Sequence, residues 1–462
     1  MAGHRWDGSP VAGNGMIIVG AGPCGLACGR ELEALGHHEF ELVESGMVAG
    51  GLAASVVDPA GFTWDRGGHV VFSHFGEFDR LVEDVMGGDL VAHDRSSFVR
   101  VAGRWVPYPF QNHLHHLPED LAEAAMVGLV EAQTGPQADS PASDFGSWIR
   151  ATFGTSICEQ FMAPYNEKVW AHPLSDMSAR WVAERVSTVD WRAALRCLLR
   201  RSDAPGWGPN DRFVFPRHGG TGEVYRRAAD RLVARISFGR EVQAVDPHRR
   251  VVTTDDGIER SYESLVWTGA LDQLVDALTV APAAVRSAAD ELAYSSVSVV
   301  GIGYESPLTD DRSWFYFPEE QIPFYRATNF AKYASDNVPG GRVDRYSSWM
   351  TEIASSPHRP LNRDGLGERV DRALRSLGLA EPEAPVASVH VDHVERAYPV
   401  PTIGRDAALA EIQPWLMDHG IYARGRFGAW RYELGNMDHA VKMGVDVARR
   451  LVHGQAEEVW GL

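Results

Sequence analysis

The stretch WDRGGHVVFSHF, which runs from Trp64 to Phe75, contains the first residues whose types and spacing could do chemistry. Two glycines precede His69, and a second histidine, His74, follows a short apolar run. An imidazole in such a place could act as a general base, bind a metal ion or be a buried structural residue. Carboxylate or histidine partners at metal-ligand spacing are missing from the stretch, so we predict no metal site. We interpret His74 as structural, and the role of His69 depends on the rest of the chain.

A glycine-rich stretch near the N-terminus has the residue types and spacing that bind a dinucleotide. Gly20, Gly22 and Gly25 follow the apolar run 16–19 as G-x-G-x-x-G, and a segment with leucines at helical spacing comes next. The first glycine permits a tight turn, the second lets a pyrophosphate approach the backbone, and the third lets the helix pack on the strand. Glu44 ends a second apolar run about twenty residues further on, where a carboxylate can accept hydrogen bonds from ribose hydroxyls. We therefore predict dinucleotide binding by this segment.

A second glycine doublet indicates which dinucleotide to expect. Gly50, Gly51 and Leu52 come soon after the acidic residue, and this combination resembles the glutathione-reductase-like FAD superfamily. In that superfamily the doublet passes close to the flavin diphosphate and ribityl chain, so the resemblance favours FAD over NAD. It also implies that Val242, in a β-rich stretch, contacts the adenine. A C-terminal helix with Asp438 in its first turn would meet the flavin.

The elements that position these residues indicate an α/β protein assembled from separated segments. With 462 residues the chain exceeds the size at which a single core keeps growing. We predict a Rossmann-like, glutathione-reductase-like FAD-binding domain made of residues 12–90, 209–284 and 396–462. Residues 91–208, after a short strand pair, are predicted to form an inserted, mainly helical domain for substrate binding or oligomerisation. Residues 285–395 are predicted to form an antiparallel β-sheet domain that also binds substrate.

Composition and charge argue against several classes of protein. The formal net charge of −18 disfavours a nucleic-acid-binding protein, which would show a basic face. The apolar runs are strand-sized, well below the roughly 20 residues that a membrane helix needs, so no membrane partner is expected. The N-terminal residues lack the basic and apolar regions of a signal peptide. The four cysteines show no metal-ligand spacing beyond one C-x3-C, and we expect free thiols in a cytoplasmic protein.

Aromatic and arginine residues gather in five later stretches: GRWVPYPFQN, APYNEKVWAHP, SWFYFPEEQIPFYRATNF, RAYPVPTIGR and ARGRFGAWRYELGN. One stretch of this kind is common on an arginine-rich surface. Five of them on a protein with a resident flavin fit a large pocket for an anionic, partly aromatic ligand. A sugar nucleotide has the required parts: a base to stack, a diphosphate for arginines and hydroxyls for polar side chains.

In the same order along nearly the whole chain, seven stretches resemble UDP-galactopyranose mutase, and more its eukaryotic than its bacterial type. They are WDRGGHVVFSHF, RWVPYPFQN, FMAPYNEKVWAHP, WGPNDRFVFPRHGGTG, PFYRATNF, YPVPTIGR and GRFGAWRYELGNMDH. The resemblance implies a flavoenzyme without net redox change that interconverts the pyranose and furanose forms of a nucleotide-linked galactose. FAD, reduced by NADPH, would attack the anomeric carbon through its N5 and form a covalent flavin–sugar adduct. Because the cofactor is then the nucleophile, no catalytic triad or carboxylate pair is required.

The resemblance also implies roles for single residues. Arg185 and Arg326 match the arginines that bind the diphosphate and stabilise its charge as it leaves. The residues expected beside the flavin ring are Gly67, Gly68, His69 and Arg426, the glycines because a Cβ would crowd the ring. The positions expected near the diphosphate are Tyr316, Tyr398 and Tyr432, and Asn436 matches an asparagine on the substrate side. The positions expected in the nucleobase pocket are Tyr108, Phe110, Gln111, Phe161, Asn166 and Trp170, with Asn210 on a closing loop.

Departures from the family pattern leave the nucleotide and the hexose open. Met437 stands where the eukaryotic pattern has a polar residue, His113 replaces an asparagine, and Ala163 and Glu167 alter the surroundings of the base pocket. A GDP-linked hexose is therefore the main alternative to UDP-galactose. A redox enzyme of the same superfamily, such as an amine oxidase or a desaturase, is more distant because it would want a more apolar channel. A flavin-free binding protein is the third alternative, and the oligomeric state is left open.

Overall fold

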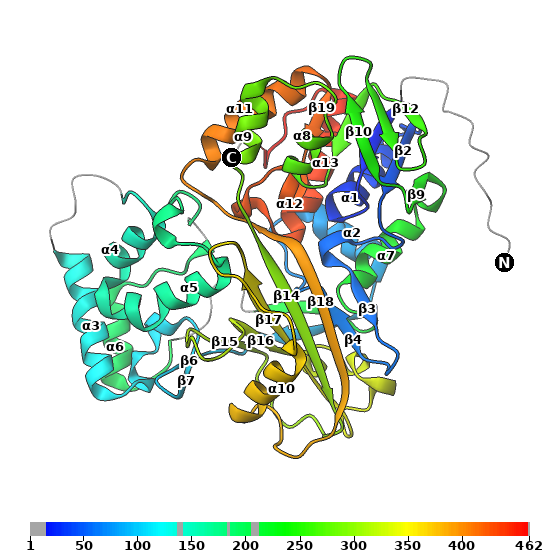
Figure 1. Ribbon diagram of the computed structural model, residues 1–462. Coiled ribbons are helices and arrows are strands. Elements are labelled where there is room, and N and C mark those ends of the chain that lie inside the picture. Colours follow the sequence, from blue (N-terminus) through cyan, green and yellow to red (C-terminus); the bar gives the residue numbers. More distant parts are fainter. Residues whose placement is uncertain (1–14, 136–141, 183–184, 205–211, 461–462) are drawn as a thin grey trace.

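The computed structural model describes residues 15–135, 142–182, 185–204 and 212–460. They form three connected units (Figure 1). A unit built on a parallel sheet lies on one side, a helical unit lies on the other, and a long, mostly antiparallel sheet joins them. In the described part of the chain, no helix combines the length and the apolar character needed to cross a bilayer.

The parallel sheet has five strands in the order β19-β13-β1-β2-β9. Its strands are β1 (Met16–Val19), β2 (Phe40–Glu44), β9 (Ile236–Phe238), β13 (Ser264–Trp267) and β19 (Ile421–Ala423). The central strand β1 pairs in register with both β2 and β13, so distant segments supply neighbouring strands. Helices cover both faces of such a sheet, which is why its strands are continuous apolar runs. Here α1 (Pro23–Ala34) and α13 (Met437–His453) share one apolar core.

The long sheet has seven strands in the order β18-β14-β17-β16-β15-β6-β7. Its strands are β6 (Ser97–Val101), β7 (Arg104–Pro107), β14 (Tyr294–Tyr304), β15 (Trp314–Tyr316), β16 (Arg326–Asn329), β17 (Ser347–Ser355) and β18 (Val386–Pro399). The strand pair β6–β7, which the sequence placed with the helical domain, is part of this sheet because β6 pairs in parallel with β15. The other pairs in the sheet are antiparallel, and β18 continues past residue 395, the predicted domain boundary.

The helical unit consists of α3 (Glu119–Thr134), α4 (Phe145–Ile157), α5 (Ala163–Trp170) and α6 (Trp191–Arg200). A π-helical turn, Cys158–Met162, joins α4 directly to α5. Such turns often occur at functional sites, and this one carries Phe161. The helices share their apolar core with β6, β7 and the site-facing residues of the long sheet.

The remaining elements connect and cover these units. The strands are β3 (Ser55–Val57), β4 (Thr63–Asp65), β5 (Leu90–Asp94), β8 (Arg212–Pro216), β10 (Val242–Asp246), β11 (Val251–Thr254) and β12 (Glu259–Ser261). The helices are α2 (Gly76–Met86), α7 (Gly222–Asp230), α8 (Leu271–Ala277), α9 (Ala283–Asp290), α10 (Leu366–Ser376), α11 (Arg405–Asp418) and α12 (Gly425–Gly428).

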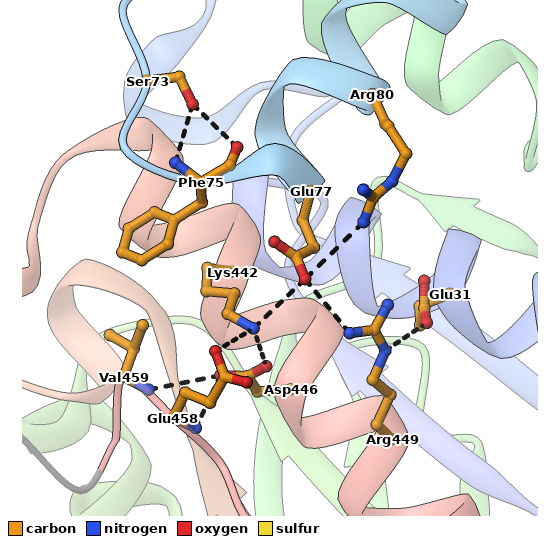
Figure 2. Close-up of polar contacts among 10 residues, drawn as sticks. All are labelled: Glu31, Ser73, Phe75, Glu77, Arg80, Lys442, Asp446, Arg449, Glu458 and Val459. Atoms are coloured by element: carbon orange, nitrogen blue, oxygen red, sulfur yellow. Dashed lines mark hydrogen bonds and ion pairs between the residues drawn. The ribbon is translucent and has the colours of Figure 1, made fainter.

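A polar cluster fixes α13 to its neighbours (Figure 2). The ammonium of Lys442 on α13 is 3.4 Å from Glu77 of α2, 2.8 Å from Asp446 and 2.9 Å from Glu458 near the C-terminus. The side chain of Lys442 is only 3% exposed, so its charge depends on these carboxylates. The cluster therefore holds the helix whose N-terminus faces the site.

Candidate active site

The glycine fingerprint lies at the turn between β1 and α1. A Cβ added to Gly25 would lie 1.9 Å from the carbonyl oxygen of Gly20, so the helix and the turn touch backbone to backbone. Gly20 has φ +101°, a left-handed conformation that favours glycine. A Cβ added to Gly22 would meet no heavy atom within 4 Å, and Gly22 is the N-cap of α1 without a side-chain cap. An open space at a helix N-terminus is the setting in which backbone N–H groups bind phosphate.

Other residues predicted for the dinucleotide lie around this turn. One carboxylate oxygen of Glu44 accepts a hydrogen bond from the Ala21 N–H at 2.6 Å, and the other accepts one from Gly46 at 2.7 Å. A Cβ added to Gly51 would lie 3.3 Å from the Cα of Gly22, so the second glycine doublet packs against the fingerprint. Leu52 and Val242 pack against one apolar core cluster. The structure thus brings the predicted FAD-binding segments together.

His69 lies in a turn, and its backbone N–H donates a hydrogen bond to the Gly67 carbonyl at 2.8 Å. Its Nδ1 is buried and has no hydrogen-bond partner in the described part of the chain. Burial lowers the pKa of His69 to about 4; Glu352 opposes this, and the cations Arg426 and Arg326 add to it. The imidazole is therefore neutral at pH 7, with one buried nitrogen that is available to a ligand.

The structure gives a reason for the glycine at position 68 that the sequence did not reveal. A Cβ there would lie 2.8 Å from a carboxylate oxygen of Glu352 and 3.2 Å from the guanidinium carbon of Arg326. The Gly68 N–H donates to Glu352 at 2.6 Å. We predicted this glycine from closeness to a flavin ring, whereas the ion pair alone already excludes a side chain.

Arg326 and Glu352 form a buried ion pair on neighbouring strands, β16 and β17. The Arg326 Nε lies 2.9 Å from Glu352, and the side chains are 15% and 2% exposed. Glu352 also accepts a hydrogen bond from the Tyr325 hydroxyl at 2.6 Å. Burial opposes both charges, but the pairing holds the pKa of Glu352 below and that of Arg326 above their ordinary values. Sequence reasoning missed Glu352, which is the only charged residue of the buried strand β17.

Two more arginines meet at a pair of tyrosines. The Arg185 Nη1 donates to the Asn436 side-chain oxygen at 2.7 Å, and its guanidinium lies 5.8 Å from the Tyr432 ring. Arg426 lies 4.9 Å from the Tyr398 ring and 5.7 Å from that of Tyr432, and burial lowers its pKa. These five residues, all predicted for the site, come from segments far apart in the sequence.

The Tyr398 hydroxyl connects this group to the ion pair. It lies 3.3 Å from the hydroxyl of Tyr325, which is bonded to Glu352. Arg326 therefore lies on the same side of the site as Arg185 and Arg426, and the three cations lie around the phenol rings of Tyr325, Tyr398 and Tyr432. Such a group is suited to a ligand that carries several negative charges.

A continuous aromatic wall extends from these tyrosines into the helical unit. The ring centroids are 4.6 Å apart for Trp170–Tyr432, 5.1 Å for Tyr108–Tyr316, 5.2 Å for Phe110–Phe161 and 5.3 Å for Tyr165–Tyr316. The sequence predicted each of these rings except Tyr165, although Tyr165 lies within a stretch already selected for its aromatic residues.

The predicted polar residues of this pocket have partners within the protein. The Asn166 amide donates to the Met162 carbonyl at 2.7 Å, within the same helical run. Gln111 donates to the Ser187 carbonyl, and its side-chain oxygen is buried with no hydrogen-bond partner among the residues that the structure describes. That oxygen is one acceptor that a ligand could use. Asn210 lies outside the described residues.

The structure also places two further groups of residues that the sequence singled out. Ala163 and Glu167 line a pocket together with Arg150 on α4. The Asp438 carboxylate does not face the site freely, because it accepts hydrogen bonds from His74 at 2.8 Å and from His439 at 3.0 Å. Burial opposes its charge, but these bonds lower the pKa of Asp438 to about 2.

Two groups of side chains in the described residues have metal-ligand atoms close together. One is His74, Asp438 and His439, and the other is His115, His116 and Asp203. The sequence did not indicate either group, because His74 is far along the chain from Asp438 and His439, and Asp203 is far from His115 and His116. In each group, hydrogen bonds between imidazole and carboxylate already account for the arrangement.

The known proteins that this chain resembles agree with the geometry of the site. The model of the flavin containing amine oxidoreductases matches residues 23–452. A crystal structure of reduced UDP-galactopyranose mutase has a TM-score of 0.93 and 37% identity, and the match covers 97% of this chain and 96% of that one.

Two more distant structures share the fold alone. Cyclohexylamine oxidase from Brevibacterium oxydans IH-35A has 15% identity and a TM-score of 0.67, over 95% of this chain and 98% of that one. The CLA-producing fatty acid isomerase from P. acnes has 14% identity and a TM-score of 0.64, over 95% and 99%. Because the fold is common to oxidases and isomerases, the assignment depends on the closer match and on the site. The chain therefore belongs to the flavin-containing amine oxidoreductase family and, within it, to the UDP-galactopyranose mutases.

Proposed function

We propose that this mutase interconverts the pyranose and furanose forms of a nucleotide-diphosphate hexose, first of all UDP-galactose, with FAD reduced by NADPH. The observation that carries the proposal is the meeting of Arg185, Arg326 and Arg426 around a group of tyrosines, next to the turn that holds His69. An amine or a hydrocarbon substrate has no use for three cations, whereas a diphosphate needs them.

The residues present fit a bound FAD. The space at Gly22 and the uncapped N-terminus of α1 suit the pyrophosphate, and Glu44 lies where a ribose would. The buried Nδ1 of His69 has no hydrogen-bond partner among the described residues, so it is open to a bond with the cofactor. A reduced flavin, when bound, supplies the nucleophile for the anomeric carbon, a group that these side chains do not provide. Everything else in the reaction is the work of the chain itself.

The arginines act on the leaving group. Arg185 and Arg326 neutralise the diphosphate in the bound substrate and stabilise the additional negative charge when the bond to the anomeric carbon breaks. Arg326 can do so in a fixed position, because Glu352 binds both its Nε and its Nη2 and so sets the orientation of the guanidinium. Tyr398 and Tyr432 contribute hydroxyl groups at the same place.

His69 acts as a neutral group. With a pKa near 4 it cannot be a cationic acid at pH 7, but its Nδ1 can exchange a hydrogen bond with the cofactor ring. The sugar ring then opens and recloses through a different hydroxyl group, within a site from which the aromatic wall excludes water. We assign the base to this wall, with Gln111 as its free acceptor.

The test is ring isomerisation by the reduced enzyme. FAD-loaded protein, reduced with NADPH, is incubated with UDP-galactofuranose or with GDP-linked hexoses, and the ring isomers are separated by chromatography. Conversion of UDP-galactose supports the proposal, and conversion of only a GDP-hexose would mean that the nucleotide is GDP instead of UDP. No conversion, together with flavin reduction by an amine, would mean that the enzyme is an oxidase and not a mutase.

Variants separate the roles. Arg185→Ala and Arg326→Ala should lose turnover by about 100-fold or more and keep FAD. Arg212→Ala is the control, because that arginine pairs with Asp94 at the surface, where both side chains are 87% exposed. Loss of FAD in either site variant, or equal loss of turnover in the control, would contradict the assignment to the diphosphate.

A further inference from the structure

Lys168 is a buried cation that the proposed chemistry does not use. It lies on α5 between Asn166 and Trp170, and its side chain is 3% exposed. Its Nζ donates hydrogen bonds of 2.8 to 2.9 Å to four backbone carbonyls, those of Phe317, Glu319, Ile322 and Phe324. The ammonium of a surface lysine would be hydrated by water, whereas this buried ammonium depends entirely on peptide oxygens.

All four carbonyls belong to one loop, which connects β15 to β16. Tyr316 ends β15 and Arg326 begins β16, and the two residues pair directly across the hairpin. The loop closes with a hydrogen bond of 2.9 Å from the Phe317 N–H to the Tyr325 carbonyl. Lys168 thus fastens to α5 the loop whose ends carry a tyrosine and an arginine of the site.

The carboxylates of this loop do not compete for Lys168. Glu319 lies 3.0 Å from Arg100, and Glu320 lies 2.6 Å from Arg359. Among the described residues no carboxylate comes within ion-pair distance of Lys168. The arginines therefore leave the lysine to the peptide backbone, which is a more specific anchor than a mobile side chain.

We propose that Lys168 is a positioning residue that fixes the separation between the two halves of the substrate site. The proposal rests on the function proposed above, in which α5 carries Asn166 and Trp170 for the nucleobase side and the hairpin carries Arg326 for the diphosphate. Base and diphosphate are joined in one molecule, so both halves can bind it at once only at a fixed separation. If the loop were released from α5, each half of the site would remain intact, but the separation between the two halves would no longer be fixed.

The charge on Lys168 should make this clamp depend on pH. Burial and the nearby Arg359 lower its pKa to about 7, against the opposing effect of Glu320 and Glu319. An ammonium has three N–H groups for the four carbonyls, whereas the neutral amine has two and turns a lone pair toward an oxygen. The clamp is therefore complete below its pKa and weakens as the pH rises through it.

The experiment compares ligands that span both halves with ligands that use one. Binding of UDP, uridine and inorganic pyrophosphate to the FAD-loaded enzyme is measured by calorimetry for wild type, Lys168→Met and Lys168→Arg. Lys332→Met, the same change at an unrelated lysine on the 3₁₀ helix Phe330–Lys332, is the control. In Lys168→Met the Kd of UDP should rise about 10-fold or more, with uridine and pyrophosphate nearly unchanged.

The pH series distinguishes positioning from a general structural role. Wild type and Lys332→Met should bind UDP less tightly at pH 9 than at pH 6, Lys168→Met should lack that part of the change, and Lys168→Arg, if it restores binding, should stay constant. Unchanged UDP affinity in Lys168→Met, or an equal loss for all three ligands, would overturn the proposal.

Hydrogen exchange provides a readout that does not depend on the ligand. Amides in residues 314–329 should exchange faster in Lys168→Met, while those of β14 should not. If the wild type binds no UDP, the proposed function fails, and exchange still decides whether the clamp exists. If the variant does not fold, the wild-type enzyme at pH 6 and pH 9 gives the comparison, and equal protection of the loop relative to β14 would refute the clamp.

Discussion

Replacing either partner of the Arg326–Glu352 pair alone should destabilise the protein about as much as replacing both. Both partners are buried, and each also binds a neighbour: Glu352 accepts from Gly68 and Tyr325, and Arg326 lies 4.8 Å from the Trp314 ring. Glu352→Gln leaves a buried arginine without its counter-charge, and Arg326→Met leaves a buried carboxylate. Each change should lower the free energy of unfolding by about 3 kcal/mol, the lower end for broken buried pairs because some hydrogen bonds remain.

The double variant should reveal the coupling. If the two effects were independent, the loss would be about 6 kcal/mol; because the double variant buries no unpaired charge, we expect only about 3 kcal/mol. The assay is urea unfolding at saturating FAD, followed by tryptophan fluorescence and far-UV circular dichroism. The same cycle on Arg342 and Asp344, whose side chains are 56% and 70% exposed, should give a much smaller coupling, because water screens both charges.

Additive losses in the first cycle would refute the reasoning. They would mean that neither charge depends on the other, and that Gly68 is a glycine for some other reason. A surface cycle as strong as the buried one would also contradict it, because the argument attributes the coupling to exclusion from water.

Three further outcomes follow from single residues. Gly25→Ala should prevent stable folding of the FAD unit, whereas Gly22→Ala should fold with normal circular dichroism and bind FAD at least 10-fold more weakly in a flavin titration, since only the cofactor fills that space; normal FAD affinity in Gly22→Ala would be evidence against the phosphate site. His69 has a lowered folded pKa, so its unfolded form takes up a proton first and stability falls as the pH drops from about 6.5 to 4; His69→Asn should remove up to about 3 kcal/mol of that fall in pH-dependent unfolding, and an unchanged slope would argue for an exposed imidazole. Glu457→Gln should cost about 3 kcal/mol in the same assay, because the Arg424–Glu457 pair is almost fully buried, and a loss below 1 kcal/mol would contradict a structural role for the C-terminal segment.

Local sequence was sufficient for the parts of the site that lie within one segment. The spacing of Gly20, Gly22 and Gly25 predicted the turn at α1 because a tight strand-to-helix connection restricts each position sterically. The aromatic and arginine stretches likewise contained most of the site, and the pattern of apolar runs indicated a sheet made from separated segments. These features depend on residue type and short spacing, which can be read directly from a chain.

The sequence by itself thus determined the cofactor turn, the fold class and the chemical character of the pocket. The tertiary structure decided which groups meet: the parallel pairing of β6 with β15, the carboxylate that binds Arg326, the histidines that enclose Asp438, and the anchor of Lys168. Gly68 and Glu352 are 284 positions apart in the sequence, yet the contact between them restricts which residue each position can hold. Contacts of this kind depend on strand order and register, which arise from packing of the whole chain and leave no trace in local spacing.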